Sequence, residues 1–494
     1  MIDTCTESLC PWCLRRIPAR RHAEGDEIYL MRNCPEHGEI KKVLIWRNSH
    51  VPFDVWTKPR TGACCATSSC NCRESTPVDP DLSIQPNCPY DCGICQKHRQ
   101  HTCSALVEVT ARCNLSCPIC FADTPEKCDP DPDIAEIENR LRMILDSAGN
   151  CPIQLSGGEP TARDDLPEII RRAHALGFDH IQINTNGLRV AEDFNYARDL
   201  RDAGATDFFL QFDGVTDDVY LKIRGRSLFA LKEAAVRNAA ELRVAVILVP
   251  TLVKGVNDSQ IGAILQFAKQ WMPTIRGVHF QPMTRLGRYP HSPQQRSPDN
   301  ADRIIIPDLL AAIVDQTGGE ISVENFIPSA CEDPRCSFTA LTVLHEDGRL
   351  IPTTHIDWAS ARGEDAAEKS IAYVRRHWSY PAPIVRPIVR KMRKIPTTCT
   401  EPTMDTPKNP VDKSASSSGR SMDTLLERVR NYSLCISGMA FQDVWNIELD
   451  RLQRCCIHVA ESDANLVPFC AYYLTGADGR RLRMDARVTG RRME

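Results

Sequence analysis

The stretches ALVEVTARCNLSCPICFAD (residues 105–123) and LSGGEP (residues 155–160) decide the fold of this chain. Each begins as a short apolar run with the character of a strand and ends in a loop of special residues. The first loop carries three cysteines with the spacing C-x-x-x-C-x-x-C, namely Cys113, Cys117 and Cys120. The second loop consists of Gly157, Gly158, Glu159 and Pro160. A strand that leads straight into such a loop predicts a site at the carboxyl end of a sheet.

The same alternation of apolar runs and amphipathic patterns continues along the middle of the chain. Apolar runs predict strands at residues 105–110, 153–156, 180–184, 207–212, 244–249 and 277–281. Amphipathic patterns predict helices at residues 134–147, 166–176, 195–203, 228–242 and 259–271. Six such repeats imply an α/β fold with a parallel sheet and helices outside it. A partial (β/α) barrel and an open doubly wound sheet fit this pattern about equally well.

The bulk composition describes an ordinary soluble globular protein. Hydrophobic residues make up 42% and charged residues 25% of the 494 residues, and the formal net charge is −4. A general nucleic-acid binder carries a basic excess, so we expect no nucleic-acid partner. The sequence has no apolar run long enough for a membrane span, and its N-terminus lacks the pattern of a signal peptide. We therefore expect a cytoplasmic protein.

The 24 cysteines are the abnormal feature of the composition. Seventeen lie within the first 151 residues, none lies between Cys151 and Cys331, and seven lie from Cys331 onward. Buried core cysteines would scatter, whereas cytosolic cysteines spaced by two or three residues are typical metal ligands. The distribution predicts metal or cluster sites toward both ends of the chain.

Residues 1–60 contain two short cysteine knuckles, Cys10-Pro-Trp-Cys13 and Cys34-Pro-Glu-His37. Two knuckles at roughly this separation predict a mononuclear tetrahedral site for Zn or Fe. The alternative is a set of free thiols at a flexible end. A zinc-ribbon protein that binds nucleic acid would carry similar knuckles, but the acidic net charge argues against it.

The C-x-x-x-C-x-x-C spacing occurs twice, and the two trios differ in the next cysteine along the chain. Three thiolates on one loop can hold three corners of a [4Fe–4S] cluster, and the fourth iron decides its role. In the irregular residues 61–104, Cys88, Cys92 and Cys95 are succeeded by Cys103, which predicts a closed auxiliary cluster. The next cysteine after Cys120 is Cys128, which lies in an acidic, proline-rich turn and is a less natural ligand. We therefore expect the open cluster on the second trio.

The cysteine loop, the GGEP turn and the loops after later strands together resemble the radical S-adenosylmethionine superfamily. Further matching loops are Asn184-Thr-Asn-Gly187, Gln211-Phe-Asp-Gly214 and Pro250-Thr-Leu-Val-Lys-Gly255. The resemblance implies a partial (β/α)6 barrel over residues 105–320, in which a reduced cluster cleaves S-adenosylmethionine to a 5′-deoxyadenosyl radical. It implies that the cofactor is held by Gly157, Gly158, Glu159, Pro160, Asn184, Asn186, Gln211 and Asp213. Glycines at such a turn let backbone approach a ligand closely, and we expect no catalytic side chain beyond the cluster ligands.

The run from Pro89 into the barrel resembles the archaeal tetraether lipid synthase group, which has also been described as hydroxymethylpterin dimethyltransferases. That resemblance implies a rubredoxin-like site at Cys10, Cys13, Cys34 and His37, and a closed cluster at Cys88, Cys92, Cys95 and Cys103. It also implies an auxiliary cluster in a C-terminal region of residues 321–395 and 424–494. The candidate ligands of that cluster are Cys331, Cys336, Cys455 and Cys470. Residues 64–72 and the linker at residues 396–423 look like insertions relative to the group.

Three functions remain open at this level. The leading hypothesis is a radical enzyme that forms C–C bonds on unactivated carbons, with lipid alkyl chains as the substrate. One alternative is a radical methyltransferase that acts on a pterin-like small molecule, and another is a non-catalytic iron–sulfur electron-transfer protein. An enzyme of this kind needs a low-potential electron donor such as ferredoxin or flavodoxin. The basic amphipathic run PIVRPIVRKMRK, residues 383–394, would allow peripheral contact with the inner membrane surface.

Overall fold

The computed structural model describes most of the chain. The described residues are 4–57, 88–90, 98–123, 130–290, 299–329, 331–354, 366–381, 426–461 and 465–482. The expectations about Cys92, Cys95, Cys128, residues 64–72, the run 383–394 and the linker 396–423 lie outside them. Among the helices in the described ranges, none is both long and apolar enough to cross a membrane.

The chain opens with a four-stranded antiparallel sheet in the order β1-β2-β3-β4. Its strands are β1 (Thr4–Leu9), β2 (Arg16–Glu24), β3 (Glu27–Cys34) and β4 (Gly38–Arg47), and the short helix α1 (Phe53–Trp56) comes next. Buried and exposed residues alternate along β2 and β3, as expected when one face is covered and the other is wet. We call this sheet, with its two cysteine knuckles, the ribbon.

Six parallel strands form the barrel, in the order β5-β6-β7-β8-β9-β11. They are β5 (Ser104–Thr110), β6 (Ile153–Gly157), β7 (Ile181–Thr185), β8 (Asp207–Gln211), β9 (Ala245–Val249) and β11 (Ile275–Pro282), and the short strand β10 (Thr251–Leu252) pairs with β11. Each predicted strand overlaps one of them. The partial barrel is thus confirmed, and the open doubly wound alternative is set aside.

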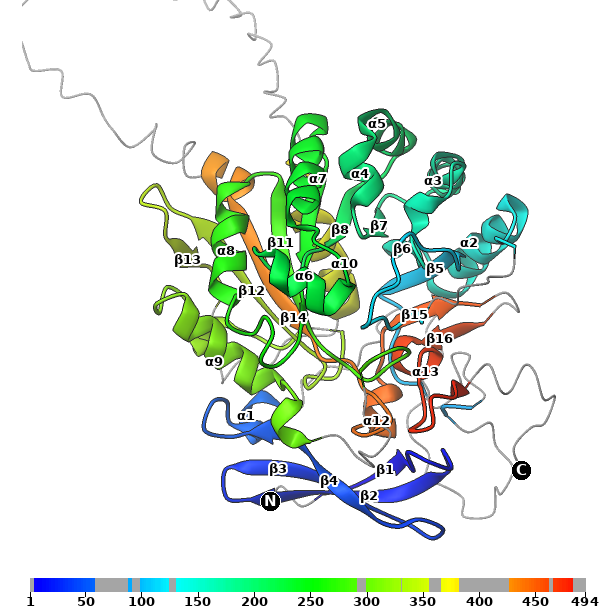
Figure 1. Ribbon diagram of the computed structural model, residues 1–494, viewed down its shortest axis with the longest axis vertical. Coiled ribbons are helices and arrows are strands. Elements are labelled where there is room, and N and C mark those ends of the chain that lie inside the picture. The colour runs from blue at the N-terminus through cyan, green and yellow to red at the C-terminus, as the bar shows by residue number, and fades with distance from the viewer. Residues whose placement is uncertain are drawn as a thin grey trace, which may run out of the picture.

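The five predicted helices are also present, and they flank the outer face of the curved sheet (Figure 1). They are α2 (Ile134–Ala148), α3 (Leu166–Ala175), α5 (Phe194–Ala203), α7 (Phe229–Leu242) and α8 (Ile261–Gln270). The capping box between Asp133 and Glu136 fixes the start of α2. Two short helices were not predicted, α4 (Leu188–Glu192) and α6 (Asp217–Arg224), and both come after loops at the carboxyl ends of strands.

The C-terminal part of the chain extends the barrel sheet at both edges. Its strands are β12 (Ser337–Leu344), β13 (Leu350–Pro352), β14 (Ser433–Met439), β15 (Ile457–Ala460) and β16 (Leu466–Pro468). β14 pairs in parallel with β11, and β15 pairs in parallel with β5. The helices of this part are α9 (Ile306–Gln316), α10 (Ala366–His377), α12 (Leu449–Leu452) and α13 (Phe469–Tyr472). Strands from the C-terminal part of the chain therefore lie next to both the first and the last strand of the barrel.

Buried ion pairs fix the ribbon to the C-terminal part. Arg21 Nε lies 2.5 Å from a carboxylate oxygen of Glu448, and Arg335 Nη1 lies 2.6 Å from the other oxygen. Arg32, which is 4% exposed, donates to the carbonyl of Val444 at 3.0 Å. Because a buried guanidinium is stable only with such partners, these contacts define how the ribbon docks.

Candidate active site and metal centres

The GGEP turn holds the cysteine loop through backbone contacts. Gly158 N donates to Thr110 O at 2.8 Å, and Glu159 N donates to Arg112 O at 2.8 Å. A β-carbon added at Gly157 would lie 2.1 Å from Thr110 O, and one at Gly158 would lie 2.2 Å from Arg112 O. These glycines therefore let two protein backbones pack together. The space that a side chain would fill belongs to the end of β5, and the expectation that these glycines also let backbone approach a ligand stays a prediction.

A second segment holds the other side of the cysteine loop. Cys120 and Arg288 exchange both backbone hydrogen bonds, each at 2.8 Å. Gly287 has a φ of +60°, and a β-carbon there would lie 2.4 Å from Phe121 O. The loop is thus fixed between the turn after β6 and the segment after β11.

The three loop cysteines line one cavity of about 580 Å³ together with Gly157, Gly158 and Glu159. Burial raises the pKa of Cys113 to about 12 and also raises that of Cys117. Among the described residues, this trio is not one of the groups whose ligand atoms all lie within 4.8 Å. Thiolates around one tetrahedral ion lie roughly 3.8 Å apart, because each bond is about 2.3 Å long. A cubane separates its thiolates more widely, so a loop of three spread thiols facing a cavity suits a cluster.

Glu159 organises the loop after β7. One carboxylate oxygen accepts from the hydroxyls of Thr161 and Thr185, both at 2.6 Å, and the other accepts from Asn186 N at 2.7 Å. Asn186 in turn donates to Asn114 of the cysteine loop at 2.7 Å. The carboxylate of Glu159 is therefore fixed in orientation by protein partners, and the residue lines the cavity.

Asp213 is also fully used by protein partners. Its carboxylate accepts from Arg224 at 2.7 and 2.8 Å, from Gln211 at 2.7 Å and from Thr251 N at 3.0 Å. Asp213 and Pro160 are not among the residues that line the cavity, whereas Asn184, Asn186 and Gln211 are. Asp213 therefore holds Arg224 in place, and its expected contact with the cofactor stays a prediction.

Two buried cations near this site were missed by sequence reasoning. Arg224 of α6 donates to Ile119 O at 3.0 Å and so contacts the cysteine loop. Lys232 of α7 donates to Gln211 Oε1 at 3.1 Å and to the carbonyl of Asn186, and burial lowers its pKa to about 8. No motif marks either residue, because each reaches the site from within a helix rather than from a loop next to a strand.

The ribbon brings its four predicted ligands together. The ligand atoms of Cys10, Cys13, Cys34 and His37 all lie within 4.8 Å of one another. Cys13 Sγ and Cys34 Sγ are 3.8 Å apart, and His37 Nδ1 lies 3.5 Å from Cys10 Sγ and 3.6 Å from Cys34 Sγ. Burial would raise the pKa of Cys34, but hydrogen bonds from His37 and nearby backbone amides lower it to about 6. These spacings fit one tetrahedral ion.

A second compact group forms where β5 meets the C-terminal part. Cys103, Cys331 and Cys456 have sulfur atoms within 4.8 Å of one another, and we call them the barrel-edge triad. Cys103 Sγ and Cys456 Sγ are 2.9 Å apart. The interaction with Cys331 raises the pKa of Cys103, and burial raises that of Cys456.

The triad brings together cysteines that the sequence assigned to two different clusters. Because Cys92 and Cys95 lie outside the described residues, the closed cluster at Cys88, Cys92, Cys95 and Cys103 stays a prediction. Cys103 lies with Cys331 and Cys456, and Cys88 does not belong to that compact group but to an apolar cluster that includes Leu14. Cys456, which was expected to be the spare member of its pair, joins the triad. Cys455 instead interacts electrostatically with Cys470 and Cys336; Cys470 is buried and the other two are half-buried. The physical reason is β15, which pairs with β5 and carries the preceding cysteines to the start of that strand.

Comparisons with known proteins agree with this geometry. The family description "Radical SAM superfamily" matches residues 107–268, and "HMPTM N-terminal zinc ribbon domain" matches residues 3–47. The chain is 33% identical to the 7,8-dihydro-6-hydroxymethylpterin dimethyltransferase of Methanocaldococcus jannaschii, over 94% of this chain and 92% of that protein. It is 33% identical to a probable GTP 3′,8-cyclase of Methanothermobacter marburgensis, over 35% of this chain and 56% of the relative. Streptococcus suis SuiB bound to S-adenosylmethionine overlaps 39% of this chain and 44% of its own, with 16% identity and a TM-score of 0.34.

Proposed function

Because this chain belongs to the radical SAM superfamily and is related over nearly its whole length to a pterin dimethyltransferase, we propose that it methylates a small heterocycle of the pterin class by radical chemistry. The observation that carries this proposal is the cavity of about 580 Å³, because it is lined both by the Cys113 loop and by a polar barrel interior. The cofactor and the substrate would share that space.

The residues present suit a three-thiolate cluster that binds S-adenosylmethionine. Cys113, Cys117 and Cys120 would hold the cluster, and the backbone of Gly157–Glu159 would face the amino acid part of the cofactor. When bound, the cluster and S-adenosylmethionine supply the one-electron chemistry that begins with hydrogen abstraction. The chain contributes rigidity, since both sides of the cysteine loop are fixed by backbone hydrogen bonds. It would also limit access of water from one side, since Leu115, Cys117 and Ile119 of the cysteine loop are buried.

The other cysteine groups would carry electrons. The barrel-edge triad borders the same cavity through Cys103, and a fourth ligand would come from outside the described residues. Cys336, Cys455 and Cys470 are candidates for a second auxiliary cluster, and the ribbon would hold Fe or Zn. A low-potential donor such as ferredoxin or flavodoxin would supply the electrons.

The volume of the cavity bears on the choice between a pterin and a lipid chain. Sites for single small molecules span roughly 300–1,000 Å³. A cavity of about 580 Å³ that also holds S-adenosylmethionine leaves room for a small ring system and little for long alkyl chains. The apolar wall of Phe338, Met439, Phe441 and Phe469 is the feature of this cavity that favours a lipid.

Anaerobic reconstitution with iron counting tests the proposed function. The Cys113→Ala variant should lose about four irons per chain and all formation of 5′-deoxyadenosine. Cys151→Ala is the matched control, because Cys151 is a buried core cysteine on the loop before β6 and should lose no iron. The wild type should convert 7,8-dihydro-6-hydroxymethylpterin to a methylated pterin. It should leave an isoprenoid lipid unchanged.

Two results would contradict the proposal. If the enzyme joined lipid chains and formed no methylated pterin, its activity would be C–C bond formation on lipids, and the proposed function would be wrong. A wild type that binds all its iron yet never cleaves S-adenosylmethionine under strong reductant would favour the electron-transfer protein.

A further inference from the structure

The interior of this barrel is polar where barrels are ordinarily filled with branched apolar side chains. Gln154 of β6 and Gln182 of β7 are register partners on adjacent parallel strands, and Asn184 lies two residues further along β7 on the same face. Ser104 stands at the start of β5. All four side chains line the cavity. We call these four residues the amide ladder.

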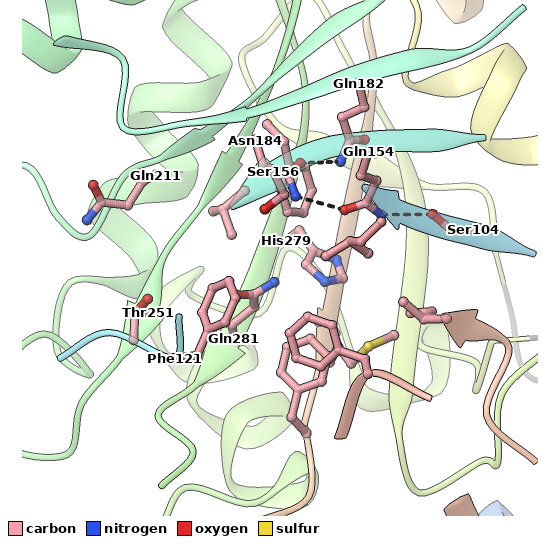
Figure 2. Close-up of a pocket in the computed structure, with 18 of the residues that line it drawn as sticks. Ser104, Phe121, Gln154, Ser156, Gln182, Asn184, Gln211, Thr251, His279 and Gln281 are labelled. Atoms are coloured by element: carbon pink, nitrogen blue, oxygen red, sulfur yellow. Dashed lines mark hydrogen bonds between the residues drawn. The ribbon is translucent and has the colours of Figure 1, made fainter. Parts of the chain in front are cut away.

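The hydrogen bonds of the ladder form a chain in which each amide donates to the next side chain, from Gln182 to Ser104 (Figure 2). Gln182 Nε2 donates to Asn184 Oδ1 at 3.0 Å, Asn184 Nδ2 donates to Gln154 Oε1 at 3.0 Å, and Gln154 Nε2 donates to Ser104 Oγ at 2.9 Å. Each amide nitrogen has two N–H groups, and the ladder uses one of them. The second N–H groups and the remaining oxygen lone pairs are available to a ligand in the cavity that these side chains line.

The cavity carries almost no charge toward this end. Among the described residues that line it, the charged side chains are Glu159, Arg224 and Glu332. Arg224 is the one cation in that set, and both of its carboxylate contacts go to Asp213. Burial lowers the pKa of His279 to about 4, so its ring is neutral near pH 7. A phosphorylated ligand would find no free cation among these lining residues, since phosphates are bound by Arg, Lys or helix N-termini.

Flat side chains stand beside the ladder. Phe209 and Trp378 stack with ring centroids 5.8 Å apart and an interplanar angle of 23°. His279 lies 5.6 Å from Phe209 and 6.0 Å from Trp378, and its Nδ1 is hydrogen-bonded to Ser437 Oγ at 2.9 Å. In the view of Figure 2 the ring of His279 lies below Asn184 and Gln154 of the ladder. Such a wall offers a stacking surface to a planar ring.

We propose that the amide ladder, together with the wall of Phe209, His279 and Trp378, is the recognition site for an uncharged planar heterocycle with lactam or amidine edges. Alternating N–H and C=O groups on such a ring pair with the unused donors and acceptors of the side-chain amides. The site excludes nucleoside triphosphates, in contrast to what the similarity to GTP 3′,8-cyclases would suggest. This assignment rests on the proposed function, whose substrate it defines.

Binding of two probes to the reconstituted enzyme tests the site without any turnover. The probes are 7,8-dihydro-6-hydroxymethylpterin and 2-naphthalenemethanol, which is also planar but has no lactam or amidine edge. The wild type should bind the pterin at least tenfold more tightly, since about 1.4 kcal/mol corresponds to tenfold in Kd. In Gln154→Met and Gln182→Met that preference should shrink at least tenfold, whereas the exposed control Gln270→Met should keep it.

The preference between probes separates recognition from a mere loss of structure, because a loosened fold weakens both. Cys113→Ala should still prefer the pterin, so a failure of the radical chemistry would leave this inference standing. If Gln154→Met preferred the pterin over 2-naphthalenemethanol as strongly as the wild type does, the proposed recognition site would be wrong. Tight binding of GTP would also contradict it. Binding of a dispersed isoprenoid lipid in competition with the pterin would also overturn it.

Discussion

The ribbon site and the barrel-edge triad are two compact cysteine groups built in opposite ways. The ribbon takes Cys10, Cys13, Cys34 and His37 from the knuckles of one small antiparallel sheet. The triad takes Cys103 and Cys456 from positions 353 residues apart and joins them through the pairing of β5 with β15. The spacing of cysteines in the sequence predicts the ribbon site. The triad forms only because β15 pairs with β5 at the edge of the barrel.

The difference also has an energetic side. A metal ion in the ribbon would join the turn between β1 and β2 to the turn between β3 and β4, whose ligands are already close, so its loss should remain local. A cluster in the triad would close very long loops, and loop closure entropy grows with loop length. We therefore expect the triad to couple the two ends of the chain more strongly than the ribbon does.

The largest expected effect comes from pairing Cys103→Ala with Cys331→Ala. The structure places both thiols in one group, so each single variant should lose the same bound iron, and the double variant should lose no more. Iron counting after anaerobic reconstitution measures this, with Cys151→Ala as the control. Additive losses would restore the grouping expected from sequence, in which the two cysteines serve different clusters.

A smaller effect is expected when the ribbon is broken. Cys13→Ala should remove one metal ion per chain and leave the other irons and S-adenosylmethionine cleavage by a chemical reductant within about twofold of wild type. Metal analysis and 5′-deoxyadenosine formation provide the readouts, and the exposed Cys5→Ala is the matched control on β1. If Cys13→Ala also lost the iron of the triad, the ribbon could no longer be regarded as a self-contained site.

The smallest effect concerns His279, a buried residue of β11 whose register partner on the C-terminal strand β14 is Ser437. Its pKa in the folded protein is about 4, below the usual value near 6.5, because burial disfavours the charged ring. The unfolded chain therefore takes up a proton between pH 6.5 and 4 that the folded chain refuses, and stability falls as the pH falls through this window. His279→Asn should lessen that loss by up to about 3 kcal/mol. Urea unfolding at pH 7 and pH 4.5 measures it, and equal acid sensitivity in the variant would show that β14 does not seal this ring from water.

Much of the barrel could be read from the sequence because its signals are local. The apolar run of β5, the cysteine loop after it and the turn at Gly157 are consecutive features, and parallel strands must bring their carboxyl ends together. The roles of Glu159 and Asp213 could not be read in the same way. Both are buried residues whose carboxylates accept hydrogen bonds from distant segments, and their expected place at the cofactor stays a prediction.

The sequence by itself determined the family, the six barrel strands, the ribbon knuckles and the trio on the loop after β5, because each depends on residues a few positions apart. Tertiary structure alone decided that Cys103 joins Cys331 and Cys456, and that amides from β6 and β7 form one ladder. Strands added at the two barrel edges bring distant cysteines together, and neighbouring strands align side chains at one height. No spacing in the sequence shows which cysteines or which amides become neighbours, because the register between paired strands decides this.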